Sequence, residues 1–194
     1  KAVTPYYERN DFWWQGLDGS RDVNNWNPWT NHNMLTAILI MDDDWERKLA
    51  GVEKVIKSLD QFINVYPDDG GCDEGPSYWG RAGASLYQNL DLLRRATKGK
   101  FDVYDKSIIK NMGNYIYKAY INYPYFVNFA DADATTGSRP QIIYSFGQDI
   151  EDPVMWKFGV FLAILVGCLS GIAIGQITEY YTAKTPVSRI AEAS

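Results

Sequence analysis

The sequence has little histidine, little cysteine and no excess of positive charge. Among 194 residues there is one histidine, and the two cysteines are Cys72 and Cys168. The formal net charge is −5, so the chain offers no basic stripe for nucleic acid, and we expect no nucleic-acid partner. Because the cysteines lie in unlike parts of the chain, we expect no disulfide between them, and they say nothing about compartment.

The scarcity of histidine also bears on metal binding. His32 cannot belong to a histidine cluster, and as a metal ligand it would need carboxylate partners. The aspartate runs 42–44 and 68–69, together with Asp73, lack the ligand spacing of a known calcium loop, which favours solvated turns. We therefore expect no metal site and no cofactor.

Aromatic side chains are abundant. They make up 15% of the residues, with 7 Trp and 14 Tyr, within a hydrophobic content of 46% that is ordinary for a globular core. Flat rings cover the apolar faces of pyranose sugars, so this composition suits a sugar-binding cleft. Large core residues in a helical stack would give the same composition, and both interpretations stay open. Because an acidic chain repels an anionic polymer, a uronate-binding cleft would have to concentrate positive charge locally.

Apolar periodicity predicts four helices, over 30–41, 44–65, 77–97 and 105–121. The first reads as a buried helix with Thr30 as its cap, and the second is strongly amphipathic and ends at a turn-forming cluster, 67–71. Short or turn-rich links between the four favour antiparallel helix pairs. Beyond them, residues 125–129 and 142–146 are β-like runs around a polar loop, 130–140.

An apolar segment follows near the C-terminus. From Phe158 to Ile177 there are 20 residues without a formal charge, and such a helix is about as long as the bilayer hydrocarbon core is thick. Glycines at 167, 171 and 175 leave a groove for a second helix, and two tyrosines follow, as interface aromatics often do. We expect a transmembrane helix, and a buried helix of a soluble protein is the competing interpretation.

This segment carries a family resemblance. Residues 171–182, Gly-Ile-Ala-Ile-Gly-Gln-Ile-Thr-Glu-Tyr-Tyr-Thr, followed by Pro186-Val187 and 190–194, resemble one helix of the membrane-bound, ion-pumping pyrophosphatases. The Asp- and Lys-rich motifs that hold magnesium and pyrophosphate in that family are absent from this sequence. The resemblance by itself therefore implies neither pumping nor hydrolysis.

A second resemblance rests on three strings in the first part of the chain. They are 24–29 (Asn-Asn-Trp-Asn-Pro-Trp), 69–80 (with Glu-Gly-Pro-Ser-Tyr-Trp at 74–79) and 125–131 (Tyr-Phe-Val-Asn-Phe-Ala-Asp). Together they resemble the heparinase II/III-like polysaccharide lyases over roughly residues 10–160. Members pair an incomplete helical toroid with a following β-sandwich, and many cleave acidic polysaccharides by β-elimination. The resemblance implies a mainly α fold, an incomplete (α/α) toroid, an acidic polysaccharide as partner and a periplasmic or extracellular location.

The chemistry explains which side chains such a site needs. Elimination at a uronate removes the proton at C5 and expels the oxygen at C4, and it requires that the neighbouring carboxylate be neutralised. By resemblance, Asn31 and His32 match a pair that some related lyases place on this carboxylate, and Tyr78 matches the acid/base tyrosine. Arg81, one turn after Tyr78, is our own addition as a source of local positive charge. The other expected substrate-binding residues are Asn25, Trp26, Trp29, Glu74 and Trp79.

Each of these residues also has a purely structural interpretation. His32 lies near a predicted helix start, where a lone histidine is often a capping or packing residue, and Tyr78 is one of many tyrosines. The asparagines among 24–27 would brace a loop equally well through side-chain to backbone hydrogen bonds.

The sequence thus divides into a helical toroid fragment (1–157), a transmembrane helix (158–183) and a polar tail (184–194). The first residues lack a signal-peptide pattern and do not begin with Met, so we expect an interior fragment. The family's sandwich is missing, and because neither half is complete, an artificial, chimeric junction near 158–166 is favoured over an evolved fusion. We expect a truncated polysaccharide lyase-like domain acting on uronic-acid-containing glycans, with its activity left open. The alternatives are a non-catalytic glycan-binding domain and a fragment of a membrane pyrophosphatase.

Overall fold

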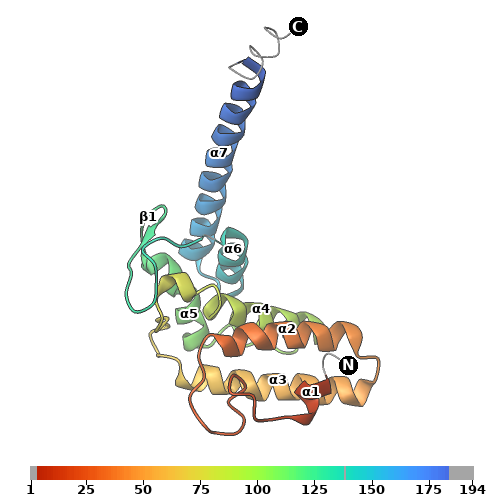
Figure 1. Cartoon of the computed structure of the whole chain (residues 1–194). Helices are drawn as coiled ribbons and strands as arrows, with labels where there is room; N and C mark the ends of the chain where they lie inside the picture. Colours follow the sequence, from red (N-terminus) through yellow and green to blue (C-terminus); the bar gives the residue numbers. More distant parts are fainter. Residues whose placement is uncertain (1–3, 138, 184–194) are drawn as a thin grey trace.

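The computed structural model describes residues 4–137 and 139–183, and these are mainly helical (Figure 1). The elements in chain order are α1 (Thr4–Glu8), α2 (Trp26–Met41), α3 (Trp45–Val65), the 3-10 helix η1 (Pro76–Tyr78), α4 (Gly83–Ala96), α5 (Ser107–Lys118), β1 (Tyr120–Asn122), β2 (Tyr125–Phe126), α6 (Pro140–Asp149) and α7 (Pro153–Ala183). The expectation of a mainly α fold that ends in one long apolar helix is confirmed.

Helices α2 and α3 lie side by side and run in opposite directions (Figure 1). The start of α3 matches the sequence prediction, because the Asp44 carboxylate accepts the Arg47 backbone N–H at 2.8 Å and caps the helix. The start of α2 was placed wrongly at Thr30, which lies inside the helix. The helix begins at Trp26, whose N–H donates to the Asn24 side chain at 3.2 Å, and Pro28 fits the first turn because no helical hydrogen bond is needed there.

The segment predicted as one helix over 77–97 is interrupted. Between η1 and α4 the chain leaves helical geometry at Ala82, where ψ is −97°. The bend accommodates Trp79, whose indole N–H donates to the Met112 carbonyl of α5 at 2.8 Å. Gly83 lies against this indole so closely that an added Cβ would be 2.7 Å from its nitrogen. Burial of Trp79 therefore overrides local helix propensity here, whereas α5 falls inside its predicted range of 105–121.

The expected β-like runs have different outcomes. Within 125–129, Tyr125 and Phe126 form β2, which pairs with β1 in an antiparallel hairpin. The run 142–146 was predicted wrongly, because it lies inside α6. The buried residues of α6 are Ile143, Phe146 and Gly147, which share one helical face, and a window of five residues is too short to reveal that period.

Helix α7 begins in the core and then leaves it. Its first turn is capped by Asp152, whose carboxylate accepts the Met155 N–H at 3.0 Å, so it starts before the predicted residue 158. Met155 and Leu162 are fully buried, and Gly147 and Gly159 allow α6 and α7 to approach backbone to backbone. The helix is continuous across the expected boundary at 157 and 158.

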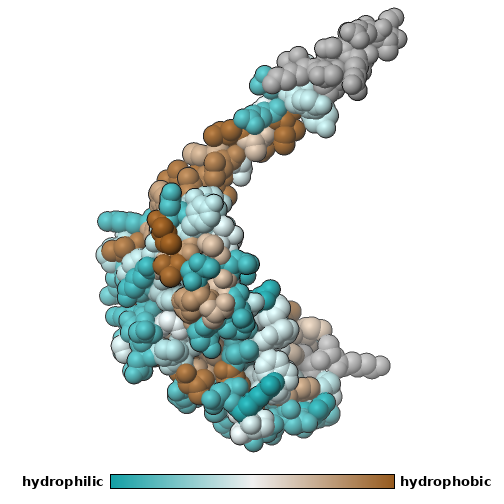
Figure 2. Space-filling model, turned by 60° about the vertical axis from the view of Figure 1, so that its left-hand side comes forward, coloured by the Kyte–Doolittle hydropathy of each residue, from teal (hydrophilic) through white to brown (hydrophobic). Residues whose placement is uncertain are grey.

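Beyond Leu162, α7 projects away from the helical body (Figure 1), and its surface there is largely apolar (Figure 2). Residues 153–182 are long and apolar enough to cross a membrane by length and composition, and 11% of the apolar stretch is buried. The expected apolar helix is thus present, with a buried root and an exposed shaft. Residues 184–194, expected to form a polar tail, lie outside the described part of the chain.

Candidate functional site

A pocket of about 420 Å³ opens beside η1, at the rim formed by η1, the segment after β2 and the start of α6. Its floor is apolar and includes Ile116, Phe126 and Ile143. The polar and charged side chains that line it are Ser77, Tyr78, Arg81, Asp133, Thr136 and Arg139. The acid/base candidate Tyr78 therefore lies in a pocket with two guanidinium groups.

A strip of tryptophans leads up to this pocket. We call Trp13, Trp26 and Trp29 the tryptophan strip: the ring centroids of Trp26 and Trp29 are 5.1 Å apart, and those of Trp13 and Trp26 are 6.0 Å apart. Trp26 is 45% exposed and Trp13 is 38% exposed, and the Arg21 guanidinium lies over the Trp13 ring, 4.2 Å from its centroid. Such exposed, neighbouring rings can stack on successive sugar units. The strip contains two residues predicted from the sequence and one, Trp13, that was not singled out.

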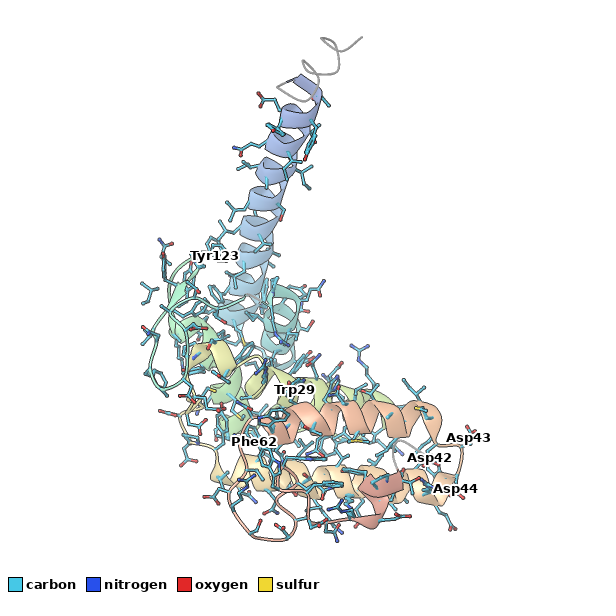
Figure 3. The ribbon with its side chains drawn as sticks, in the orientation of Figure 1. Trp29, Asp42, Asp43, Asp44, Phe62 and Tyr123 are labelled. Atoms are coloured by element: carbon cyan, nitrogen blue, oxygen red, sulfur yellow. The ribbon has the colours of Figure 1, made fainter. Side chains whose placement is uncertain are left out.

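Arg81 joins the strip to the pocket. Its guanidinium carbon lies 5.0 Å from the ring centroid of Trp29 and 6.0 Å from that of Tyr78. Figure 3 shows Trp29 near the N-terminal end of α2, far from Asp42, Asp43 and Asp44 at its other end. A guanidinium thus lies next to the aromatic rings, while the longest acidic run lies away from them.

Arg139 was missed by sequence reasoning. It is the residue before α6, and its side chain lies across Gly80, where an added Cβ would be 2.9 Å from its Nε. Within 4–137 and 139–183, neither Arg81 nor Arg139 forms an ion pair. No local sequence signal identifies Arg139, because only the fold brings the start of α6 to η1.

Asn25 and Glu74 contact each other beside the strip. The Asn25 side-chain amide donates to the Glu74 carboxylate, which fastens the loop before η1 to the start of α2. Burial raises the pKa of Glu74 above its ordinary value, and the nearby Asp73 and Asp131 add to this effect. The positive charge of Arg81 lowers the pKa of Glu74 and so opposes them. Asn25 is only 4% exposed, so this pair supports the loop that carries Tyr78.

Asn31 does not reach the site. Its side chain is fully buried, and its amide donates to Ser58 Oγ at 2.8 Å and to Asn27 Oδ1 at 3.3 Å. The hydroxyl of Tyr6 donates to Asn31 Oδ1 at 3.4 Å. This network holds α2, α3 and the N-terminal segment together. Contact between Asn31 and a substrate carboxylate, as expected by resemblance, is therefore not possible in this arrangement.

His32 lies on α2, the helix that also carries Trp26 and Trp29. It is three residues after Trp29 on α2, so the two side chains share a face of the helix. The ring is half-buried, and within the described chain its Nδ1 has no hydrogen-bond partner. Burial lowers the pKa of His32 below its ordinary value, because desolvation disfavours the charged imidazolium.

Trp79 belongs to the core. It is 2% exposed, and its indole N–H is occupied by the Met112 carbonyl. It therefore has no ring face to offer as a sugar platform, which was its expected role. Of the predicted residues, the structure brings together Tyr78, Arg81, Trp29 and Trp26, with Asn25 and Glu74 behind them.

The described residues contain no group of three or more metal-ligating side chains among His, Cys, Asp and Glu. The arrangement combines stacking surfaces, two unpaired guanidinium groups and a tyrosine hydroxyl, which suits a sugar that carries an anionic group. Comparison with protein-family models gives no match, and comparison with curated proteins also gives none.

Proposed function

We propose that the chain binds a uronate-containing polysaccharide along the tryptophan strip, and that Tyr78 acts as acid/base in β-elimination at the adjoining pocket. One observation carries the proposal: Arg81 contacts the rings of both Trp29 and Tyr78. A sugar stacked on the exposed ring of Trp26, next to Trp29, would have its anionic group toward the guanidinium groups of the pocket and its ring toward Tyr78. The proposed partner is an acidic polysaccharide, and no cofactor is needed.

The reaction would use these groups as follows. A guanidinium neutralises the uronate carboxylate, so that negative charge developing at C5 is stabilised. With its own proton first given up to solvent, the Tyr78 oxygen accepts the C5 proton, the C4–C5 double bond forms, and the bond from C4 to the bridging oxygen breaks. The same tyrosine then returns a proton to the departing oxygen. The products are an unsaturated uronate and a shortened glycan.

Substitution of Tyr78 by Phe tests the chemistry. The wild-type chain, incubated with alginate, polygalacturonate, hyaluronan and heparosan in turn, should generate the ultraviolet absorbance of unsaturated uronate with at least one of them. Tyr78→Phe should abolish this absorbance and leave binding of that polymer intact. Tyr125→Phe, at an exposed position of β2, is the matched control and should remain active. If the wild-type chain produces no absorbance with any uronate polymer, the lyase proposal fails.

A second candidate is a glycan-binding domain without catalysis. The complete burial of Asn31 favours it, because the expected Asn–His pair then does not face the pocket. In this case Trp26→Ala would reduce glycan binding, no product would form, and Tyr78→Phe would change nothing. Measuring binding and product formation on the same variants separates the two candidates.

Two finer structural proposals accompany this function. We propose that the antiparallel pair α2 and α3, with α4 and α5 beside it, is part of an incomplete (α/α) toroid. We also propose that the exposed shaft of α7 holds the domain at a membrane, in line with its length and apolar surface.

A further inference from the structure

The two guanidinium groups of the pocket are not equivalent. Arg81 is engaged by the aromatic rings on either side of it, Trp29 and Tyr78. Arg139 lines the same pocket, yet within the described residues it takes part in no ion pair, ring contact or side-chain hydrogen bond. Arg139 is therefore the charged group of the pocket whose donors are free to bind a ligand.

The Arg139 guanidinium occupies the space that a side chain at Gly80 would fill. A Cβ built on Gly80 would lie 2.9 Å from Arg139 Nε, 3.1 Å from Cζ and 3.3 Å from Nη2. The guanidinium thus lies flat against the backbone between Tyr78 and Arg81, and this close approach requires glycine. The planar group lines the same pocket as Tyr78.

The charges around the pocket leave a place for an anion. Among the described lining residues, Asp133 is the acidic one, and Arg81 and Arg139 are the two basic ones. Glu74, which is near Arg81, already accepts a hydrogen bond from Asn25. The Glu74 carboxylate offsets the charge of Arg81, whereas Arg139 forms no ion pair among the described residues, so an anionic ligand would bind at its guanidinium. Arginine is suited to a planar carboxylate because its paired N–H groups bind both oxygens at once.

We infer that Arg139 is the specificity-determining residue of this site: its guanidinium binds the carboxylate of the uronate in the pocket. The inference rests on the proposed function. It assigns to Arg139 the binding of the uronate carboxylate, a role that the family resemblance implied for Asn31 and His32. Arg81 then holds the sugar's position through the tryptophan strip, and Gly80 positions Arg139.

The test compares acidic and neutral forms of the same sugar. The probes are tetrasaccharides of mannuronate, guluronate, glucuronate and galacturonate, each paired with its carboxyl-reduced neutral counterpart. Calorimetry on the full chain gives an affinity ratio for each pair. Because a hydrogen bond to a charged group is a strong one, the wild-type chain should prefer the acidic member of at least one pair by about tenfold or more.

Arg139→Gln should bring this ratio close to one and leave affinity for the neutral member unchanged. Arg139→Lys should retain part of the preference, since charge is kept while the planar fork is lost. Gly80→Ala should lower the ratio as well, because its methyl group displaces the guanidinium. Arg95→Gln removes the same charge from an exposed side chain of α4 and should have no effect.

The outcomes separate the two proposals. If the wild-type chain prefers the acidic probe and Arg139→Gln keeps the full preference, the inference about Arg139 is overturned and the proposed function stands. If the wild-type chain binds none of the acidic probes, both fail. Thermal unfolding of each variant is recorded alongside. A structural defect would weaken binding of acidic and neutral probes alike, and loss of affinity for both would therefore also count against a role for Arg139 in specificity.

Discussion

The guanidinium of Arg81 lies over the indole ring of Trp29, with its central carbon 5.0 Å from the ring centroid. This contact links the segment between η1 and α4 to the first turn of α2. It also places a positive charge between a tryptophan that could carry a sugar and the tyrosine that could act on it. This local positive charge matters because a chain of net charge −5 repels an anionic polymer unless its binding site carries basic groups.

Arg81→Met should lower the affinity for the polyuronate that the wild-type chain binds. The methionine keeps much of the contact with Trp29 and loses the charge, so the expected loss is about tenfold, in the range of a charge-assisted hydrogen bond. The dependence of affinity on salt should also become shallower, because exposed charges are screened. Calorimetry at two ionic strengths checks both effects. Arg95→Met is the control, and an unchanged affinity in Arg81→Met would remove Arg81 from the site.

Asn31→Ala should lower the free energy of unfolding. Removing the amide leaves the Tyr6 hydroxyl without its buried acceptor and takes one of three hydrogen bonds from Ser58 Oγ, which costs about 1–3 kcal/mol of unfolding free energy. Urea denaturation measures this loss. Asn33→Ala, two residues further along α2 at an exposed position, should unfold like the wild-type chain. If Asn31→Ala instead has the unfolding free energy of the wild-type chain and loses elimination activity, Asn31 would act on the substrate carboxylate, as the family resemblance implied.

His32 should titrate below the ordinary value of 6.5, because burial penalises its charged form. The folded-state pKa then lies below the unfolded one. This contribution to stability is present above pH 6.5 and is lost as the pH falls toward the folded-state pKa. Since His32 is the single histidine, one imidazole signal in a proton NMR titration reports its pKa directly. His32→Gln should flatten the fall in stability over the same pH range. A pKa above 6.5 would show that a nearby negative charge outweighs burial.

The helices that could be predicted from the sequence are those whose own residues determine them. The amphipathic period of α3 and its Asp44 cap are local, and its limits were placed within one residue. The helix α6 could not be found in this way, because its apolar face becomes distinct only when it packs on α7 through Gly147. The break before α4 likewise depends on a hydrogen bond from Trp79 to α5, which local propensity does not contain.

The candidate site was predictable only in part for the same reason. Tyr78 and Trp29 were proposed from their motifs and Arg81 from its place one turn after Tyr78, and the structure brings the three together. Trp79 stands next to Tyr78 in the same motif and points into the core, since neighbouring residues in a tight turn face different directions. Arg139 lies in a loop without a motif, and its role becomes visible only when the start of α6 reaches Gly80.

Substitutions in the buried root and in the exposed shaft of α7 should have different effects. Met155 is fully buried in its root, so Met155→Ala should reduce the unfolding free energy by about 2–5 kcal/mol, as cavity-forming core substitutions do. Ile172 is 58% exposed on the shaft, and Ile172→Asp should leave thermal unfolding of the body unchanged. The aspartate should weaken association with phosphatidylcholine vesicles in a flotation assay, because a carboxylate in the middle of an inserted helix costs about 3 kcal/mol. Equal flotation of wild type and Ile172→Asp would show that the shaft does not enter the bilayer, and unfolding of Ile172→Asp would show that it is covered by protein.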